Sequence, residues 1–323
     1  MPRLGVLGTL VWDTIRPAGR RDATVEDWGG IAYSLAAFSA IGPEGWTLVP
    51  MIKIGADLRE RADRFLRGLA RPGSTDGLRT VSEPNNRVEL RYHDPARRCE
   101  TLTGGVPAWD WPELRPLVLS CDALYVNFIA GWEIGLGTAR ELRAAFRGPV
   151  YSDLHSLMLG TGDGGVRRLR PLADTGAWLA CFDFVQVNEE EIRILTGREG
   201  DPLKLAEALL AEGPGGVLVT LGAAGAVWAA RERFTAPWGA GGEAEATAPR
   251  AVRRGRATPE GSVGAKTDPT GCGDVWGMSC FAAWLGGARL DDAVRAANRN
   301  AARKLGTSGT ARLEAVLREA SAA

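Results

Sequence analysis

Hydrophobic residues along this chain fall into short runs that alternate with longer segments of helical periodicity. The short runs predict strands at residues 4–7, 47–52, 123–128, 150–152, 184–187 and 217–221. Helical patterns are predicted at 32–41, 58–69, 138–146, 189–195 and 203–211. Repeated strand-then-helix order predicts an α/β fold, with a mostly parallel sheet and helices on both faces. Such sheets bind ligands beyond the carboxyl ends of their strands, so residues that directly follow a strand are the candidates for a site.

Two segments depart from this order. Residues 87–92 alternate polar and apolar positions, and a second extended run follows at 99–103. This pattern predicts a β-hairpin with one polar face, which is either a small flap beside the main domain or a surface decoration. Residues 237–266 are rich in Gly, Ala, Pro and Arg and lack periodicity, so they predict a loop or a flexible insertion.

Composition narrows the class of protein. The chain has 323 residues, with 39 Lys+Arg against 39 Asp+Glu, so no basic excess indicates a nucleic-acid partner. Five cysteines, an odd number without metal-ligand spacing, are typical of reduced thiols in a cytoplasmic protein. No secretory signal opens the chain, and no apolar stretch is long enough to span a membrane. Two histidines leave little room for a His-based metal site.

The strongest local signal is a glycine-rich turn, residues 268–274, which precedes an almost uninterrupted apolar helix at 275–285. A helix that is apolar on all sides is buried. Amides at a helix start are unpaired and carry partial positive charge, and glycines let a phosphate approach them closely. Asp274 lies at the mouth of this helix, where helix capping is the plainer interpretation of a carboxylate. Capping alone does not require two glycines in front and a buried helix behind.

The sequence Asp-x-Thr-Gly-x-Gly-Asp at 268–274 resembles the C-terminal signature of the ribokinase family, also called the phosphofructokinase B family of sugar and nucleoside kinases. The usual form in that family is Asp-Thr-x-Gly-Ala-Gly-Asp, so Pro269 and Cys272 are departures. Further motifs agree in order: the first-strand turn with Gly8 and Asp13, the glycine pair at 29–30, Asn-x-x-Glu at 188–191 and Thr-x-Gly-x-x-Gly at 220–225. The resemblance implies one ribokinase-like three-layer domain over residues 1–323, with a small β lid from about 13–28 and 85–105.

The resemblance also implies roles for particular residues. Asp274 is the expected catalytic base, beside an anion hole formed by the four amides of Gly271, Cys272, Gly273 and Asp274. Mg²⁺ is expected near Glu191 and Asp153. Some members of the family also bind a monovalent cation near the glycine-rich turn, so the resemblance is compatible with a K⁺ site here. The expected ATP contacts are Asn188, Thr220, Gly222, Gly225 and Asn298. The expected contacts to the phosphate acceptor are Asp13, Gly29, Gly30, Ser34 and Asn127.

Several of these assignments have a simpler alternative. An acidic first turn such as 189–191 favours a helix by itself, and a glycine after a strand is most often only a turn. His155, two residues beyond the strand end at Asp153, is either part of a site or a structural histidine. Asn298 lies on the buried stripe of the last helix, at 291–305, where a backbone hydrogen bond would satisfy it. The Gly-rich span at 261–267, which includes Lys266, only superficially resembles a P-loop.

The function expected from these residues is ATP-dependent transfer of the γ-phosphoryl group to a hydroxyl of a small molecule. A sugar or nucleoside is favoured, because the Asp13 carboxylate can accept hydrogen bonds from two neighbouring hydroxyls. A vitamin kinase of the pyrimidine or pyridoxal type, and a non-catalytic nucleotide- or sugar-binding regulatory protein, are the alternatives. A nicotinamide-dependent dehydrogenase lacks support, since the first strand's turn has no Gly-x-Gly-x-x-Gly. A homodimer that forms through the lid is compatible with the resemblance.

Overall fold

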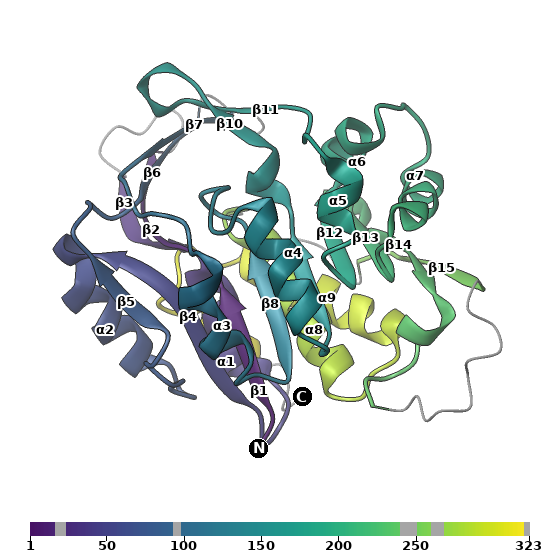
Figure 1. The fold of residues 1–323 in the computed structure, drawn as a ribbon, viewed down its shortest axis with the longest axis horizontal. Helices are drawn as coiled ribbons and strands as arrows, with labels where there is room; N and C mark the ends of the chain where they lie inside the picture. The colour runs from purple at the N-terminus through teal and green to yellow at the C-terminus, as the bar shows by residue number, and fades with distance from the viewer. Residues whose placement is uncertain (17–23, 93–97, 240–250, 260–267, 320–323) are drawn as a thin grey trace.

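In the computed structural model, which describes residues 1–16, 24–92, 98–239, 251–259 and 268–319, nine strands form one central sheet (Figure 1). Seven of these strands run parallel to their neighbours, and β14 and β15 are antiparallel at one edge. The predicted mostly parallel α/β sandwich is therefore confirmed. In spatial order the strands are β15 (Val252–Ala257), β14 (Ala226–Arg231), β13 (Gly216–Thr220), β12 (Phe184–Asn188), β9 (Val150–Asp153), β8 (Ala123–Asn127), β1 (Arg3–Leu7), β4 (Thr47–Gly55) and β5 (Leu78–Val81).

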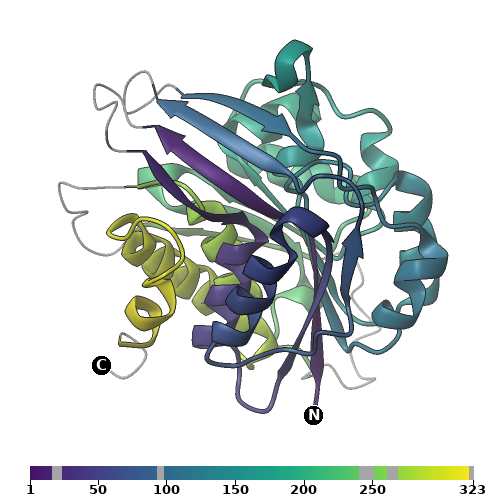
Figure 2. The same ribbon diagram turned by 90° about the vertical axis from the view of Figure 1, so that its left-hand side faces the viewer.

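Helices cover both faces of this sheet, because its strands bury alternate side chains on opposite sides. In β8, Tyr125 packs into one core, and Leu124 and Val126 pack into the other. Figure 2 shows the sheet between the two helical layers. One layer contains α1 (Ile31–Ile41), α2 (Arg59–Gly68), α8 (Cys272–Leu285), α9 (Leu290–Leu305) and α10 (Leu313–Glu319). The other contains α3 (Trp111–Val118), α4 (Leu136–Ala145), α5 (Thr175–Leu179), α6 (Glu189–Thr196) and α7 (Pro202–Leu209).

Helices α1 and α8 are buried along nearly their whole length, as their all-round apolar sequences predict. Helix α8 contacts α1 on one side and α9 on the other, and it lies against the sheet. Its N-terminus is thereby fixed at the carboxyl edge of the parallel strands.

A second, four-stranded sheet stands beside the main one and has a small apolar core of its own. The two strands of the predicted hairpin pair antiparallel, with Arg87 opposite Thr103, and the turn at 93–97 lies outside the described residues. A short hairpin, β10 (Leu159–Thr161) with β11 (Arg167–Leu169), meets this sheet through the bridge between Thr101 and Val166. The second sheet consists of β3 (Val25–Gly30), β2 (Leu10–Arg16), β6 (Arg87–Tyr92) and β7 (Arg98–Thr103).

The prediction of an unstructured segment at 237–266 is wrong in part, because β15 forms within it. Most side chains of β15 are exposed or half-buried, since the strand lies at the sheet edge and carries three arginines. Gly255 is required there, because a Cβ would lie 2.3 Å from Nε1 of the Trp228 indole. Residues 240–250 and 260–267, including Lys266, lie outside the described residues. None of the described helices is both long and apolar enough to span a membrane.

Candidate active site

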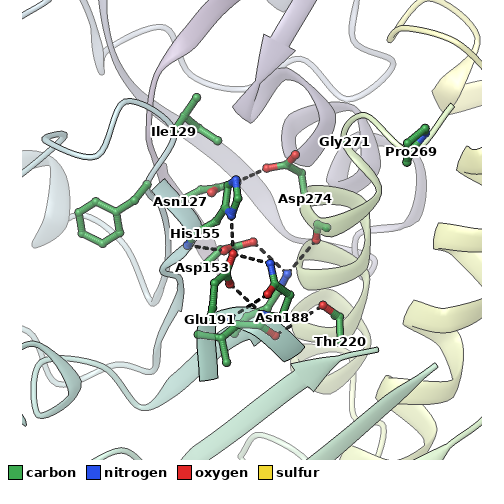
Figure 3. A pocket seen from close by; sticks show the side chains of 14 residues that line it. Asn127, Ile129, Asp153, His155, Asn188, Glu191, Thr220, Pro269, Gly271 and Asp274 are labelled. Atoms are coloured by element: carbon green, nitrogen blue, oxygen red, sulfur yellow. Dashed lines mark hydrogen bonds and ion pairs between the residues drawn. The ribbon is translucent and has the colours of Figure 1, made fainter. Parts of the chain in front are cut away.

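Polar residues stand at the carboxyl ends of four neighbouring strands, β8, β9, β12 and β13. The strand interiors are buried, whereas their last residues, Asn127, Asp153, Asn188 and Thr220, line a cavity of about 260 Å³ (Figure 3). Pairing places Asn127 opposite Asp153 and Asn188 opposite Thr220. The first turn of α8, with Asp274, forms the facing wall of this cavity. The predicted site residues at strand ends are thus brought together, as expected for a parallel sheet.

Asp274 points into the cavity and does not cap its own helix. No side chain caps the N-terminus of α8. The Asp274 Oδ1 accepts a hydrogen bond from Asn127 Nδ2 at 2.6 Å, and that amide nitrogen also lies 3.3 Å from the Ser34 hydroxyl. The capping alternative is therefore wrong for this carboxylate, and Asn127 holds its orientation.

Burial raises the pKa of Asp274 above that of an ordinary aspartate, and the hydrogen bond from Asn127 and the charge of His155 oppose the rise. A raised pKa makes the carboxylate a better proton acceptor when a hydroxyl is brought against it. The geometry and the electrostatics both suit a general base.

The turn before α8 needs Gly271. This residue is the N-cap, with a φ of 77°, and a Cβ on it would lie 2.4 Å from the Tyr33 ring. The Cys272 amide donates to the Pro269 carbonyl at 3.1 Å. That amide is engaged within the turn, which does not favour the predicted contribution of Cys272 to an anion hole. The amides of Gly271, Gly273 and Asp274 stay predicted donors. Burial raises the pKa of the Cys272 thiol to about 12, so the thiol stays protonated at neutral pH.

Asn188 and Glu191 form a capping box at the start of α6. The Asn188 Oδ1 accepts from the amides of Glu190 and Glu191 at 2.9 Å, and Glu191 Oε2 accepts from the Asn188 amide at 2.8 Å. His155 Nδ1 lies 2.5 Å from the other oxygen of Glu191. The simpler interpretation of this acidic turn is therefore present in the structure, and both oxygens of Glu191 already have partners.

Gln186 connects the sheet to α8. Its Nε2 donates to Asp153 Oδ2 at 2.9 Å and to the Gly273 carbonyl at 3.0 Å, and its Oε1 accepts from Tyr151 at 2.7 Å. Sequence reasoning missed Gln186, which stands between Val185 and Val187 inside a strand. A polar residue at a buried strand position was the available signal, because such a group needs partners.

The cavity carries an excess of negative charge. Burial, together with the charges of Glu191 and Asp274, raises the pKa of Asp153 to about 7. For His155, desolvation would lower the pKa, but the charge of Glu191 outweighs it and raises the value to about 9. The imidazole is then protonated at neutral pH and balances one carboxylate. No group of three His, Cys, Asp or Glu side chains in the described residues converges as a metal site.

A second cavity, of about 540 Å³, adjoins the first and shares Thr220, Pro269 and Gly273 with it. Gly222 and Gly225 lie along its edge with φ of 56° and 89°, and a Cβ on Gly225 would overlap the Ala257 carbonyl at 2.1 Å. Its remaining lining is largely apolar, with Ala223, Pro259, Trp276, Ala301, Ala302 and Leu305.

Asn298 also lines this second cavity, but its amide is engaged. Its Oδ1 accepts from the Trp276 indole at 2.8 Å, and its Nδ2 donates to the Ala257 carbonyl at 2.9 Å. Asn298 therefore has the structural hydrogen bonds that were the alternative to a nucleotide contact. Its side chain would contact a ligand only through van der Waals packing.

The residues expected to bind the acceptor are spread more widely. Ser34 is fully buried behind Asn127, whereas Asp13, Gly29 and Gly30 belong to the second sheet and line neither of these two cavities. A Cβ on Gly29 would lie 1.9 Å from Asp13 Oδ2, so the glycine makes room for that carboxylate. Gly30, with a φ of 60°, makes the junction from β3 to α1.

Comparison with known proteins agrees with the motifs. Residues 168–315 match the family model described as pfkB family carbohydrate kinase. No curated protein matches the sequence. Among solved structures, a pyrophosphate-dependent kinase in the ribokinase family, complexed with a pyrophosphate analog and myo-inositol, has a TM-score of 0.73 at 16% identity and covers 96% of this chain and 98% of its own.

Two further structures are similar over nearly the whole length. Ribokinase from Cryptococcus neoformans, in complex with ADP, has a TM-score of 0.71 at 18% identity and covers 99% of this chain and 100% of its own. A nucleoside kinase from Burkholderia thailandensis, in complex with inosine, has a TM-score of 0.68 at 16% identity and covers 99% of both chains. At such identities the structures show the fold, which is ribokinase-like. The family model over residues 168–315 agrees with the resemblance to the ribokinase family that the motifs indicate.

Proposed function

We propose that this protein is an ATP-dependent kinase that transfers the γ-phosphoryl group to a hydroxyl of a sugar or nucleoside. The observation that carries the proposal is the Asp274 carboxylate, buried in the first turn of α8 and oriented by Asn127. It lines the polar cavity, and its neighbour Gly273 lines both this cavity and the largely apolar one.

In the proposed reaction the acceptor oxygen attacks the γ-phosphorus. The bond from phosphorus to the acceptor oxygen forms, the bond from phosphorus to the β–γ bridging oxygen breaks, and the hydroxyl proton moves to Asp274. Phosphoryl transfer depends mainly on positioning and on stabilisation of charge. The amides of Gly273 and Asp274, at the positive end of the α8 dipole, supply fixed donors for the transferring group.

ATP is the favoured donor because of the second cavity. Its apolar walls suit the flat face of an adenine base, whereas pyrophosphate has no apolar surface to bury there. The glycines at 222 and 225 leave the loop after β13 free of side chains at the cavity edge. The ADP complex of the Cryptococcus ribokinase supports a nucleotide donor. Pyrophosphate is the competing donor, because another similar structure is that of a pyrophosphate-dependent kinase.

The polar cavity fits Mg²⁺ held largely through water. Mg²⁺ commonly binds one or two carboxylates and the phosphates of the substrate. Asp153 is the favoured carboxylate, because burial and then the charges of Glu191 and Asp274 raise its pKa, and a bound cation would oppose all three. Asn188 lines the same cavity. When bound, Mg²⁺ would neutralise charge on the phosphates. Glu191 would act indirectly, through His155 and Asn188.

The acceptor is proposed to lie between Asp274 and the second sheet. Asp13 on β2 offers a carboxylate to paired hydroxyls, and myo-inositol and inosine in the related structures are both polyhydroxyl compounds. The turn at residues 268–271, which precedes α8, is called the catalytic turn below. Tyr92 on β6 already reaches Thr270 of this turn, at 3.3 Å between the hydroxyl oxygens. This contact supports a lid that closes over the acceptor and excludes water.

The test is turnover by the purified protein. ATP–Mg²⁺ and pyrophosphate–Mg²⁺ are each offered with a panel of sugars, sugar acids, cyclic polyols, nucleosides and vitamins, and phosphorylated products are identified by mass spectrometry. We expect a phosphorylated sugar or nucleoside with ATP alone. Binding of ATP without a product from any acceptor would favour the non-catalytic regulatory protein instead.

A further inference from the structure

A lysine is fully buried beneath the catalytic turn. Lys304, in the last turn of α9, has an exposed fraction of 0%. Its ammonium donates to the Asp268 carbonyl at 3.1 Å and to the Thr307 carbonyl at 2.9 Å, and it lies 3.5 Å from Asp268 Oδ2. The ammonium is also 5.2 Å from the centroid of the Tyr33 ring. A buried charge persists only where such partners compensate its lost hydration.

These partners belong to the turn that opens α8. Asp268 starts the turn, its Oδ1 accepts from the Thr270 amide at 3.0 Å, and its own amide donates to Leu305 at 3.0 Å. The Tyr33 ring packs under Gly271 at the other end of the turn. The ammonium therefore contacts the start of the turn directly, and its end through the Tyr33 ring.

We propose that the Lys304 ammonium is an internal monovalent cation that holds the catalytic turn and makes the protein independent of K⁺. The part of this proposal that concerns activity rests on the proposed kinase function. The part that concerns the structure of the turn does not. Lys304 is a positioning residue, since it acts through the turn and lines neither cavity.

Among the described residues, K⁺ at the start of the turn would have to share the carbonyl and carboxylate oxygens of Asp268 and Thr307 that Lys304 already contacts. A second monovalent cation at the same oxygens would be repelled by the first. The C-terminal end of the α9 dipole adds to the attraction for one positive charge there.

The chain contains a matched control in Lys53. Its side chain is also nearly buried, and its Nζ donates to the Ala108 carbonyl at 2.9 Å, pairs with Glu113 at 2.5 Å and lies 4.9 Å from the Trp109 ring. Lys53 thus has a carbonyl, a carboxylate and an aromatic ring as partners, as Lys304 does. None of those partners belongs to the catalytic turn.

The first experiment measures the thermal midpoint of wild type, Lys304→Ala and Lys53→Ala in potassium, ammonium, sodium and tetramethylammonium chloride at equal ionic strength. We expect wild type to show no preference for K⁺. Lys304→Ala should lose at least about 5 °C in tetramethylammonium and regain part of it selectively in K⁺ or NH₄⁺, which can enter the vacated space. Lys53→Ala should be destabilised without cation selectivity. A Lys304→Ala variant with the same salt response as Lys53→Ala overturns the proposal.

The second experiment uses the acceptor found in the substrate screen. Wild-type turnover should be equal in the four salts, and Lys304→Ala should be several-fold more active in K⁺ or NH₄⁺ than in tetramethylammonium. Lys304→Met, which fills the space without charge, should be poorly active in every salt. A wild-type enzyme that K⁺ activates several-fold contradicts the proposal, even if Lys304→Ala fails to fold. If no acceptor is turned over, the kinase assignment fails and the thermal measurement still decides the role of Lys304.

Discussion

The two adjoining cavities differ in chemistry although they share three residues. The 260 Å³ cavity is walled by the polar ends of four strands, whereas the 540 Å³ cavity is walled by α9, α8 and the loop after β13. Strand ends bring carboxylates and amides to one point, and helix faces supply apolar surface. Under the proposed function, the polar cavity would hold the reacting groups and the apolar cavity the base of the donor. The N-terminus of α8 lies between them, so Asp274 is within reach of both ligands.

The largest effect should come from the polar cavity. Asp274→Asn keeps the shape of the side chain but removes the proton acceptor, so turnover should fall by about a hundred- to ten-thousand-fold. The fold should remain, as circular dichroism would show. Asp183→Asn is the matched control, because Asp183 precedes β12 at the opposite edge of the sheet and binds Arg143. Turnover by Asp274→Asn close to that of the control would remove the base assignment.

Asp13 tests whether the acceptor lies on the side of the second sheet. Asp13→Ala should raise KM for the acceptor by roughly ten- to a hundred-fold, since a charged hydrogen-bonding group to substrate hydroxyls is lost. KM for ATP should change little. Steady-state kinetics with each substrate varied in turn would show it, and a collapse of ATP binding with the acceptor unaffected would reverse the proposed orientation of the site.

The apolar cavity can be filled from α9. Ala302 is half-buried and lines this cavity, so Ala302→Phe should raise KM for ATP by about ten-fold and leave KM for the acceptor unchanged. Ala296→Phe is the control, because Ala296 is half-buried on the same helix but lines neither cavity. Equal effects of the two variants would mean that the cavity does not hold the nucleotide.

Much of the sheet and of the polar cavity could be predicted from the sequence, because the hydrophobic patterns that indicate them are local. Short apolar runs predicted six of the seven parallel strands, and residues at their ends, such as Asn127 and Asp153, were predicted as site residues. Strands β5, β14 and β15 were not predicted. Strands β5 and β15 lie at the two edges of the sheet and need not bury both faces, and β15 carries mostly arginine and glycine. Strand β14 is buried, but three of its six residues are alanine, which is depleted in strands.

The partners of the site residues depend on tertiary contacts that no short motif records. Gln186 reaches Gly273 and Lys304 reaches Asp268 across long stretches of chain. A lysine in the last turn of a helix is predicted to be exposed, because lysine is rarely buried without a partner. The burial of Lys304 depends on the turn that packs over it, which the local sequence does not show. For the same reason Asn298 was predicted as a nucleotide contact, although Trp276 and Ala257 occupy its amide.

The smallest expected effect concerns the charges that distinguish the polar cavity. His155 faces Glu191, Glu100 and Asp153, and its pKa is raised from the ordinary 6.5 to about 9, the attraction to Glu191 outweighing desolvation. Between these values the folded protein binds a proton that the unfolded chain releases. The stability that protonated His155 gains from Glu191 is therefore complete below pH 6.5 and is lost as the pH rises towards 9.

His155→Gln should flatten that part of the pH profile, because the neutral amide cannot take up the proton. Urea unfolding at a series of pH values across this window measures the slope for wild type and variant. Ala302→Phe, in the apolar cavity, should keep the wild-type slope. Asp153 also makes stability fall as the pH rises, but it does so between its ordinary pKa of 3.8 and its raised pKa of about 7. The contributions of Asp153 and His155 can therefore be separated by the pH range in which each slope appears. An unchanged slope in His155→Gln would mean that the imidazole does not carry its charge in the folded protein, and the polar cavity would then hold more uncompensated negative charge than proposed.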